Sequence, residues 1–487
     1  MAAPGKRAAT LLNRYRSLSE VKKTALWFTI CNYLQRGTAV ITVPIFTRLL
    51  TTQQYGLFNT YLAWFEVLGL LTSLKLPHDG LNNGLIRYET DKDGFASAMV
   101  GLTVILNLFW ALIYLVFHKT LDSVIGMTPF LMLFLFIQML FNPPLYIWIN
   151  RERFDFRYRT PVLVTMLITV LSPVISVLAV LFTPYKAEAR IIALSCMQGL
   201  FGLILLFVLL RKGKRFFHRE YWRFALRFSL PLLFHYLSMV VLTETDRIQI
   251  SRICGDGATA VYSVAYSAAM LVNLVVQAVS GTFSAWMYRK LKNKAYDDIT
   301  SVVGKLYLLI GGACAMIAAL APDLVRLMAT EEYMEAVRII PPVSCSVFFI
   351  FVYTMFANVA MYYDETKLLS LAAIVCSAAN IILNDIFIRR YGYVAAGWTT
   401  LFSYALLTVL HALLYRKTRL RHGLPIGMLC EKKLPLLSAV MVLGCGGMLI
   451  SYSLGWLRYL FLAILALSTY VVYRKLRGRN GKNQEDL

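Results

Sequence analysis

Charged residues are scarce in this sequence: Asp, Glu, Lys and Arg make up 15% of the 487 residues, whereas hydrophobic residues make up 58%. A soluble globular domain carries about 25% charged residues, so this composition excludes an ordinary soluble fold. The apolar residues form blocks of about 20, the length of a helix that crosses the hydrocarbon core of a bilayer. Helices satisfy their own backbone hydrogen bonds in lipid. We therefore expect an all-α integral membrane protein.

The sequence also lacks the spacing of a metal or redox site. Its eight cysteines include no CxxC pair, and no Cys or His ligand pattern is present. The connections between apolar blocks are shorter than about 20 residues, which leaves no room for an extramembrane catalytic domain. An integral membrane polymerase or ligase, the enzyme alternative, usually carries a long catalytic loop. We expect a protein that is not an enzyme and that holds no metal or cofactor.

The apolar blocks predict about 14 membrane spans, at residues 25–46, 56–76, 96–117, 129–149, 161–183, 190–210, 228–250, 258–287, 301–320, 338–361, 367–388, 394–415, 434–453 and 457–474. Lys and Arg concentrate at both ends of the chain and in the even-numbered connections. By the positive-inside rule, both termini are cytoplasmic. The net charge of +23 then reflects topology and contact with anionic membrane lipids, and we expect no nucleic-acid binding.

A weak internal repeat relates the first half of the chain to the second. The copies are offset by 203 residues at Asn32 and His235 and by 204 residues at Phe58 and Tyr262. Six spans lie between the copies, so both halves face the same way, as in transporters built from parallel repeats. The predicted parts are a basic cytoplasmic segment, a first six-helix lobe, a second six-helix lobe, and two further helices with a basic tail: 1–23, 24–224, 225–415 and 416–487.

Several ionisable residues interrupt the predicted spans. Each charge at the centre of a bilayer costs about 2.5–3.5 kcal/mol on insertion scales, so such residues usually line a wet path or pair with each other. Arg36 is either a cavity cation that binds phosphate oxygens or the structural partner of an acid such as Glu66. Glu66 lies near the middle of the second span, where it can both pair with Arg36 and line the cavity. Arg247 either contacts substrate or forms a helix-end pair with Asp246 or Glu244. These charges indicate that something polar moves through the membrane.

Further candidates follow from spacing. Asn380 and Asn384 share one helix face, where they bind either sugar hydroxyls or a partner helix. The neighbouring Asp385, together with Glu244 and Asp246, is a candidate for coupling transport to H⁺ or Na⁺, because a desolvated carboxylate can exchange a proton near neutral pH. The basic residues predicted at cytoplasmic mouths, as headgroup attractors or as topology determinants, are Lys75, Arg87 and Arg157.

Three sets of motifs resemble the Wzx-type polysaccharide flippases. They lie at residues 32–37 (NYLQRG), 44–51 (PIFTRLLT) and 54–58 (QYGLF), at residues 228–232 (FSLPL), 245–248 (TDRI) and 260–266 (AVYSVAY), and at residues 380–384 (NIILN) and 391–397 (YGYVAAG). The resemblance covers nearly the whole chain. It implies membership of the MOP superfamily, which also holds the MATE exporters and the lipid II flippase, and a fold of two six-helix lobes around a central cavity.

The implied function is to turn undecaprenyl-diphosphate-linked oligosaccharide from the inner to the outer leaflet of a bacterial cytoplasmic membrane. The implied partners are the lipid-linked oligosaccharide, a polysaccharide polymerase and chain-length proteins. Glu244 and Asp246 depart from a purely basic centre, and they mark either an ion-coupling site or a pair for Arg247. A MATE-type antiporter of small molecules or cations is the alternative, against which the positive charge of the first span argues.

Overall fold

The computed structural model describes residue 17, residues 19–365 and 367–453, and residues 455, 456, 458, 459, 461 and 463. Every regular element of these residues is a helix, which confirms the predicted all-α fold class. Nearly all of the predicted cytoplasmic segment before residue 19 lies outside the described residues. So do most of the predicted span 457–474 and the basic tail that follows it.

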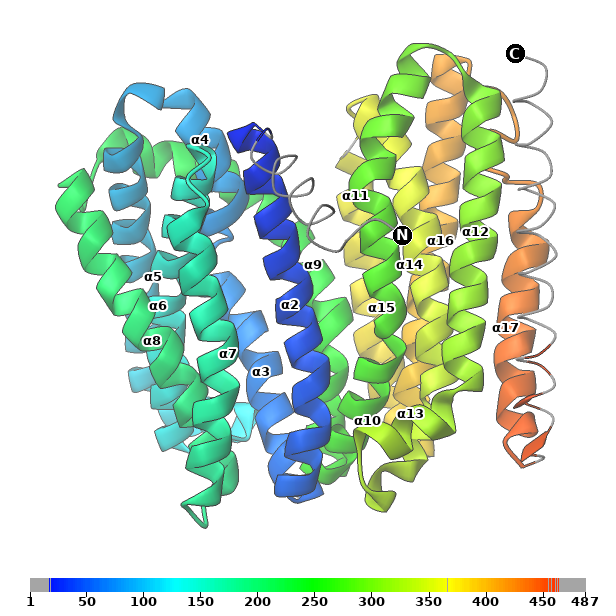
Figure 1. Cartoon of the computed structure of the whole chain (residues 1–487), viewed down its shortest axis with the longest axis horizontal. Helices are drawn as coiled ribbons and strands as arrows, with labels where there is room; N and C mark the ends of the chain where they lie inside the picture. Colours follow the sequence, from blue (N-terminus) through cyan, green and yellow to red (C-terminus); the bar gives the residue numbers. More distant parts are fainter. Residues whose placement is uncertain are drawn as a thin grey trace, which may run out of the picture. The chain divides into compact units, whose positions relative to one another are not determined.

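The chain divides into two compact units, Met1–Val240 and Val241–Leu487 (Figure 1). The boundary falls inside α9, whereas the sequence predicted lobes at 24–224 and 225–415, and that lobe assignment stays a prediction. Unit 1 ends within α9 (Arg219–Cys254). Its other elements are α2 (Glu20–Leu49), α3 (Thr52–Ser73), a π-helical turn η1 (Leu76–Gly80), α4 (Leu81–Arg87), a 3₁₀ turn η2 (Glu89–Asp91), α5 (Lys92–Ile125), α6 (Pro129–Phe154), α7 (Arg159–Leu181) and α8 (Lys186–Gly213).

Unit 2 begins in the second part of α9. Its further elements are α10 (Asp256–Ala269), α11 (Leu271–Lys292), α12 (Tyr296–Ala319), α13 (Ala321–Met328), a 3₁₀ segment η3 (Glu331–Arg338), α14 (Ile340–Tyr362), α15 (Lys367–Tyr391), α16 (Ala395–His422) and α17 (Leu434–Ser451). Helix α14 lies at the centre of this unit, where it packs against α10, α12, α16 and α17. Its middle is therefore buried on nearly all sides.

Local sequence signals explain where helices begin and end. Thr51 and Gln54 form a capping box at the start of α3, with each side chain bonded to the other's backbone N–H. Thr128 caps α6, whose first residue is a proline, the position where a missing N–H costs nothing. Gly126 ends α5 in the left-handed conformation, with φ of 73°. These three signals fix the turns between the spans of unit 1.

Ten helices within the described residues are long and apolar enough to cross a membrane, and two bent helix pairs raise that number to twelve. Helix α2 has 30 residues but is not among them, because polar side chains such as Gln35 and Arg36 interrupt its apolar run. The predicted span at 258–287 is not one straight helix: it consists of α10 and α11, which are bent by 41° and pass the length and hydropathy test only as a pair. The other bent pair is α3 with η1 and α4, at 45°.

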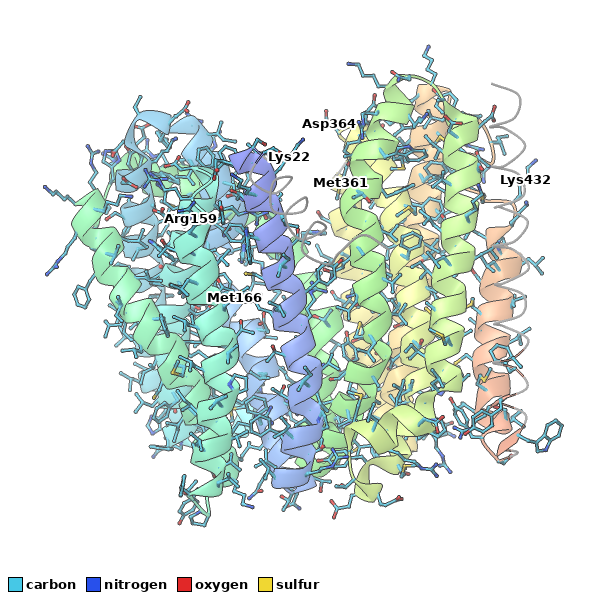
Figure 2. All side chains as sticks on the ribbon, viewed as in Figure 1. Lys22, Arg159, Met166, Met361, Asp364 and Lys432 are labelled. Atoms are coloured by element: carbon cyan, nitrogen blue, oxygen red, sulfur yellow. The ribbon has the colours of Figure 1, made fainter. Side chains whose placement is uncertain are left out.

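The basic connections of unit 1 come together at one end. Arg151, at the end of α6, bonds to Asp93 at 2.8 Å and to Asp155 at 2.6 Å, and Lys92 bonds to Asp155 at 3.1 Å. Thr24 of α2 bonds to the backbone of the α6–α7 turn at 3.0 Å, and Figure 2 shows Lys22 and Arg159 at this same end. These segments therefore lie at one end of unit 1, and their position on the cytoplasmic side of the membrane stays a prediction.

Asp155 is held in its ionised form at that end. Burial alone would raise the pKa of Asp155, but hydrogen bonds from Arg151 and Lys92 outweigh it and hold the pKa below its usual range. In unit 2, Glu365 follows α14 and accepts bonds from Thr418 at 2.6 Å and Arg421 at 2.7 Å, which lower its pKa. In each unit, one carboxylate thus binds basic residues of the connecting segments: Asp155 in unit 1 and Glu365 in unit 2.

Candidate functional site

Asp246 of α9 is the centre of a buried polar cluster in unit 2. It is 0% exposed, and its carboxylate accepts hydrogen bonds from Tyr262 Oη at 2.5 Å, Thr400 Oγ1 at 2.6 Å and Asn384 Nδ2 at 2.6 Å. These donors lie on α10, α16 and α15, so four helices meet at one carboxylate. Taking an ionised carboxylate out of water is costly unless such partners surround it. The cluster is therefore a place built to hold a charge.

The two asparagines of α15 extend this cluster. Asn384 Nδ2 also lies 3.4 Å from Asn380 Oδ1, and Asn380 Nδ2 donates to Ser403 Oγ at 3.3 Å. Thr399 donates to Asn384 Oδ1. The predicted common face is thus confirmed. Both asparagines are 0% exposed and bond to side chains of the neighbouring helices α9 and α16, so their contacts match the partner-helix alternative and not a surface open to sugar.

Arg247 pairs with Glu244 and not with Asp246. Its Nη1 lies 2.5 Å from Glu244 Oε2, and its guanidinium lies 4.6 Å from the centre of the Tyr266 ring. Of the two predicted partners, the structure selects Glu244, since the oxygens of Asp246 are taken by hydroxyl and amide donors. Within the described residues, Arg247 Nε is buried without a hydrogen-bond partner. The pair therefore keeps one strong donor unused.

Asp385 lies apart from this cluster. It is exposed and pairs with Arg389, one turn along α15, at 2.9 Å. A solvent-exposed pair of this kind contributes little to stability, because water screens it. The structure therefore brings Asp246 and Glu244 to the neighbourhood of Arg247, but it does not bring the third predicted coupling residue there.

Arg36 lies in the middle of α2 and is partly buried. The predicted structural pair with Glu66 is wrong: in the described part of the chain, no ion pair joins the two, and no acid lies within 4.0 Å of the Arg36 guanidinium. A guanidinium without a fixed acid keeps its five N–H donors for another anion. The other interpretation of Arg36, as a cation for a ligand, stays a prediction.

Glu66 instead lines a cavity inside unit 1. The cavity has a volume of about 360 Å³, toward the lower end of the range of about 300–1,000 Å³ for small-molecule sites. Its polar lining comes from α3, α6, α8 and the turn after α3, and comprises Glu66, Ser73, Lys75, His78, Gln138, Asn142, Tyr146 and Gln198. The cavity therefore holds one acid, one amine and three amides among apolar side chains.

Amide groups at this cavity are joined in a chain of hydrogen bonds. Gln138 Oε1 accepts from Tyr61 Oη at 2.8 Å and from Ser195 Oγ at 3.1 Å. Gln138 Nε2 donates to Gln198 Oε1 at 2.8 Å, and Asn142 Nδ2 lies 3.3 Å from the same oxygen. The network fixes which end of each amide faces which neighbour. Gln198 thus has both acceptor sites filled and an NH₂ group left over.

The backbone break after α3 carries Lys75 into this lining. Leu74 and Lys75 both have left-handed conformations, with φ of 48° and 56°, which are rare for residues other than glycine and are typical of functional sites. Lys75 was predicted at a cytoplasmic mouth together with Arg87 and Arg157. The three make different contacts: Lys75 lines the cavity, Arg87 lies 5.2 Å from the Phe224 ring, and Arg157 pairs with Glu152 at 3.8 Å.

Comparison with protein families gives the class of the chain. Residues 21–287 match the family described as polysaccharide biosynthesis protein. The chain belongs to this family. Residues 231–386 also match the MatE family, and none of the curated proteins compared matches the chain.

Solved structures give the fold of this polysaccharide biosynthesis family member. The lipid II flippase MurJ in an inward closed conformation is similar at a TM-score of 0.66 and 15% identity, covering 93% of this chain and 99% of that one. An inward-facing multidrug resistance MATE family transporter is similar at 0.55 and 14%, covering 80% and 94%. A MOP superfamily transporter from Pyrococcus furiosus is similar at 0.55 and 13%, covering 84% and 97%. The chain has the fold of the MOP superfamily transporters.

Several residues of these sites were not predicted. In the cluster around Asp246 they are Tyr262, Thr399 and Thr400, and in the cavity of unit 1 they are His78, Gln138, Asn142 and Gln198. A signal existed for two of them, because Gln138 and Asn142 are four residues apart and share a face within an apolar block. Gln198 stands alone in its block, and nothing in its neighbourhood marks it.

Proposed function

We propose that this polysaccharide biosynthesis family member flips an undecaprenyl-diphosphate-linked oligosaccharide across a bacterial cytoplasmic membrane. The cargo moves from the inner to the outer leaflet by alternating access, and both termini of the chain are cytoplasmic. The observation that carries the proposal is Arg36, a cation in the middle of a long helix, with no acid among the described residues within 4.0 Å of its guanidinium. A guanidinium in that state binds two oxygens of a diphosphate at once.

The family match supports this cargo over others. Residues 21–287, which include Arg36 and the whole cavity lining of unit 1, match a family named for polysaccharide biosynthesis. A lipid-linked sugar presents a diphosphate and many hydroxyls, and each needs a partner when it leaves water. Arg36 supplies the cation, and the amides of unit 1 supply hydrogen-bond groups. A polymerase and chain-length proteins would receive the exported unit.

We place the coupling ion, H⁺ or Na⁺, at Asp246. The side chains around it bring together carboxylate, amide and hydroxyl oxygens from α9, α15 and α16, and oxygen ligands are those that hard cations prefer. A proton on Asp246 would change the same hydrogen bonds. Binding of either ion would alter how four helices of unit 2 are held, so it can bias one conformation over another.

An antiporter of the MATE type is the second candidate, and the match of residues 231–386 to the MatE family favours it. Such a protein needs acids for an organic cation and has no use for an unpaired arginine in α2. The two candidate functions therefore differ in the charge of the cargo: an anionic diphosphate, which Arg36 attracts, or an organic cation, which Arg36 repels.

The test is complementation of a flippase-null bacterial strain with wild-type chain and with Arg36→Gln. We expect the wild type to restore surface polysaccharide for at least one repeat-unit type. Loss of the guanidinium should slow export at least tenfold, because a hydrogen bond to a charged group contributes about 1.5–3 kcal/mol. Arg219→Gln, which removes an exposed arginine of unit 1, is the matched control.

Accumulated lipid-linked precursor and surface polysaccharide are measured together, with membrane insertion checked by immunoblot. If Arg36→Gln exports as well as the control at equal abundance, Arg36 is not the cargo cation. If the wild type complements no strain but protects cells from organic cations, the MATE alternative is correct.

A further inference from the structure

We propose that the cavity inside unit 1 binds one uncharged sugar ring of the cargo, held by Gln198, Asn142 and Glu66. This inference rests on the proposed function and assigns a role to a cavity distinct from Arg36. The cavity is lined by α3, α6, α8 and the turn that follows α3. At about 360 Å³ it has room for one or two sugar rings and not for a whole lipid-linked oligosaccharide.

The hydrogen-bond groups left over at the cavity are those that a sugar needs. Gln138 and Gln198 use their carbonyl oxygens on partners within unit 1. In the described residues, no hydrogen bond occupies Gln198 Nε2, Asn142 Oδ1 or the Glu66 carboxylate. A sugar hydroxyl both donates and accepts, so it can accept from Gln198 and donate to Asn142 or Glu66. The bonds already made hold these amides in place before a ligand arrives.

The two charges of the cavity have opposite signs, so together they favour neither an anionic nor a cationic ligand. It holds one carboxylate, Glu66, and one amine, Lys75, which do not form an ion pair within 4.0 Å in the described structure. A diphosphate would meet Glu66 at close range, and an organic cation would meet Lys75, and like charges in a poorly hydrated site repel. An uncharged polar ring meets neither penalty. Its hydroxyls can accept from the ammonium and donate to the carboxylate.

Apolar side chains complete the fit. Phe65, Leu62 and Met139 line the same cavity, as do the rings of His78 and Tyr146, whose centres are 5.7 Å apart. A sugar ring has C–H faces between its hydroxyl edges, and aromatic and aliphatic side chains remove these faces from water. The mixture of amides, one acid and ring faces is what distinguishes this cavity from a lipid-binding groove.

The test measures binding of free N-acetylglucosamine, glucose and galactose to the full chain in lipid nanodiscs that contain no sugar detergent. Isothermal titration calorimetry gives the affinity, for which we expect a Kd on the order of 1 mM, as is usual for a contact of one ring. Gln198→Leu and Glu66→Gln should each weaken binding about tenfold, because the first leaves a sugar hydroxyl without its donor and the second replaces a charged acceptor with a neutral one. Thermal unfolding of each variant reports whether it is folded. If Gln198→Leu does not fold, Glu66→Gln provides the binding test.

Gln53→Leu is the matched control, because Gln53 is an exposed glutamine of the same unit and should leave binding unchanged. Arg36→Gln should also keep sugar binding while export is lost, which separates this inference from the proposed function. The inference is overturned if no sugar binds, if the two cavity variants bind like the control, or if Arg36→Gln abolishes sugar binding. It is equally overturned if tetraphenylphosphonium or inorganic diphosphate binds in a Glu66-dependent manner and sugars do not.

Discussion

At the scale of single residues, the chain treats its membrane charges in two opposite ways. Asp246 is fully enclosed and receives three hydrogen bonds of 2.5–2.6 Å. Arg36 is partly buried, and no acid of the described structure lies within 4.0 Å of it. A saturated charge stabilises the fold around it, whereas an unsaturated one remains available for a ligand. We therefore assign Asp246 to the control of conformation and Arg36 to the cargo.

Replacing Asp246 with Asn should destabilise unit 2 and remove its response to ions. The new NH₂ group would face Asn384 Nδ2 or a hydroxyl that now donates to the carboxylate, which should cost about 1–3 kcal/mol. Thermal unfolding in nanodiscs, with and without NaCl at constant ionic strength, measures both effects. If Na⁺ couples here, it should raise the Tm of the wild type only.

The matched control for that experiment is Asp385→Asn. The Asp385 side chain is half-exposed and pairs with the neighbouring Arg389 on the same helix, so its loss should leave the Tm close to that of the wild type. Equal Tm values for the two variants would show that the buried cluster contributes no more than a surface pair, and the assignment of Asp246 would then be wrong.

At the scale of elements, the second span of each half is broken. Helix α3 turns by 45° into η1 and α4, and α10 turns by 41° into α11. Interrupted helices at matching positions of two halves are typical of transporter binding sites. Here the first break delivers Lys75 to the cavity, and α10, before the second break, delivers Tyr262 to Asp246. The two helices begin at Thr52 and Asp256, which are 204 residues apart, the same offset as between Phe58 and Tyr262, whereas the breaks themselves are 196 residues apart, at Leu74 and Met270.

Sequence patterns predicted some of these features and missed others for physical reasons. The common face of Asn380 and Asn384 follows from helix geometry alone, so it was predictable. The break at Leu74 and Lys75 was not, because neither residue favours a left-handed backbone and tertiary packing imposes it. The sequence narrowed the partner of Arg247 to two acids: Glu244, three residues before it, and Asp246, which directly precedes it. Only the structure, in which hydroxyls already occupy Asp246, selects Glu244.

A second element-scale prediction concerns the end of unit 1, where Asp155 ties α5 to α6. Its folded pKa is below the ordinary value, so Asp155 binds fewer protons in the folded state than in the unfolded state. Its contribution is therefore fully present above the unfolded pKa of about 3.9 and is lost as the pH falls through the lower, folded value. Asp155→Asn should lower stability at pH 7 by about 1–3 kcal/mol, because it leaves the buried Arg151 with Asp93 alone.

Thermal unfolding of wild type and Asp155→Asn from pH 7 down to pH 3 checks this sign. The difference between them should be largest near neutrality and should shrink at the acid end. Glu89→Gln is a suitable control, since Glu89 lies 4.0 Å from Lys92 and is largely exposed. A difference that grows on acidification would contradict the assigned direction of the pKa shift.

At the scale of the whole molecule, the excess of positive charge is not spread evenly. Within unit 1, the start of α2 and the even-numbered connections meet at one end, through Thr24, Arg151 and Lys212. Within unit 2, the connections after α14 and α16 meet through Glu365 and Arg421. Clustered Lys and Arg next to spans are retained on the cytoplasmic side and attract anionic headgroups, at about 1 kcal/mol per residue. We therefore expect the excess of Lys and Arg, which gives the net charge of +23, to set the orientation of the chain in the membrane.

This distribution predicts which connections face the cytoplasm. A reporter fused after residue 215, beyond α8, should fluoresce as a green fluorescent protein and be inactive as alkaline phosphatase, because that connection is rich in Lys and Arg. A fusion after residue 126, beyond α5, should show the reverse, and fusions at the carboxyl end should behave like those after residue 215. Each pair of reporters on one site controls for expression, since a given site can activate only one of them. Alkaline phosphatase activity after residue 215 would invert the topology, and the cargo would then meet Arg36 from the opposite leaflet to the one proposed.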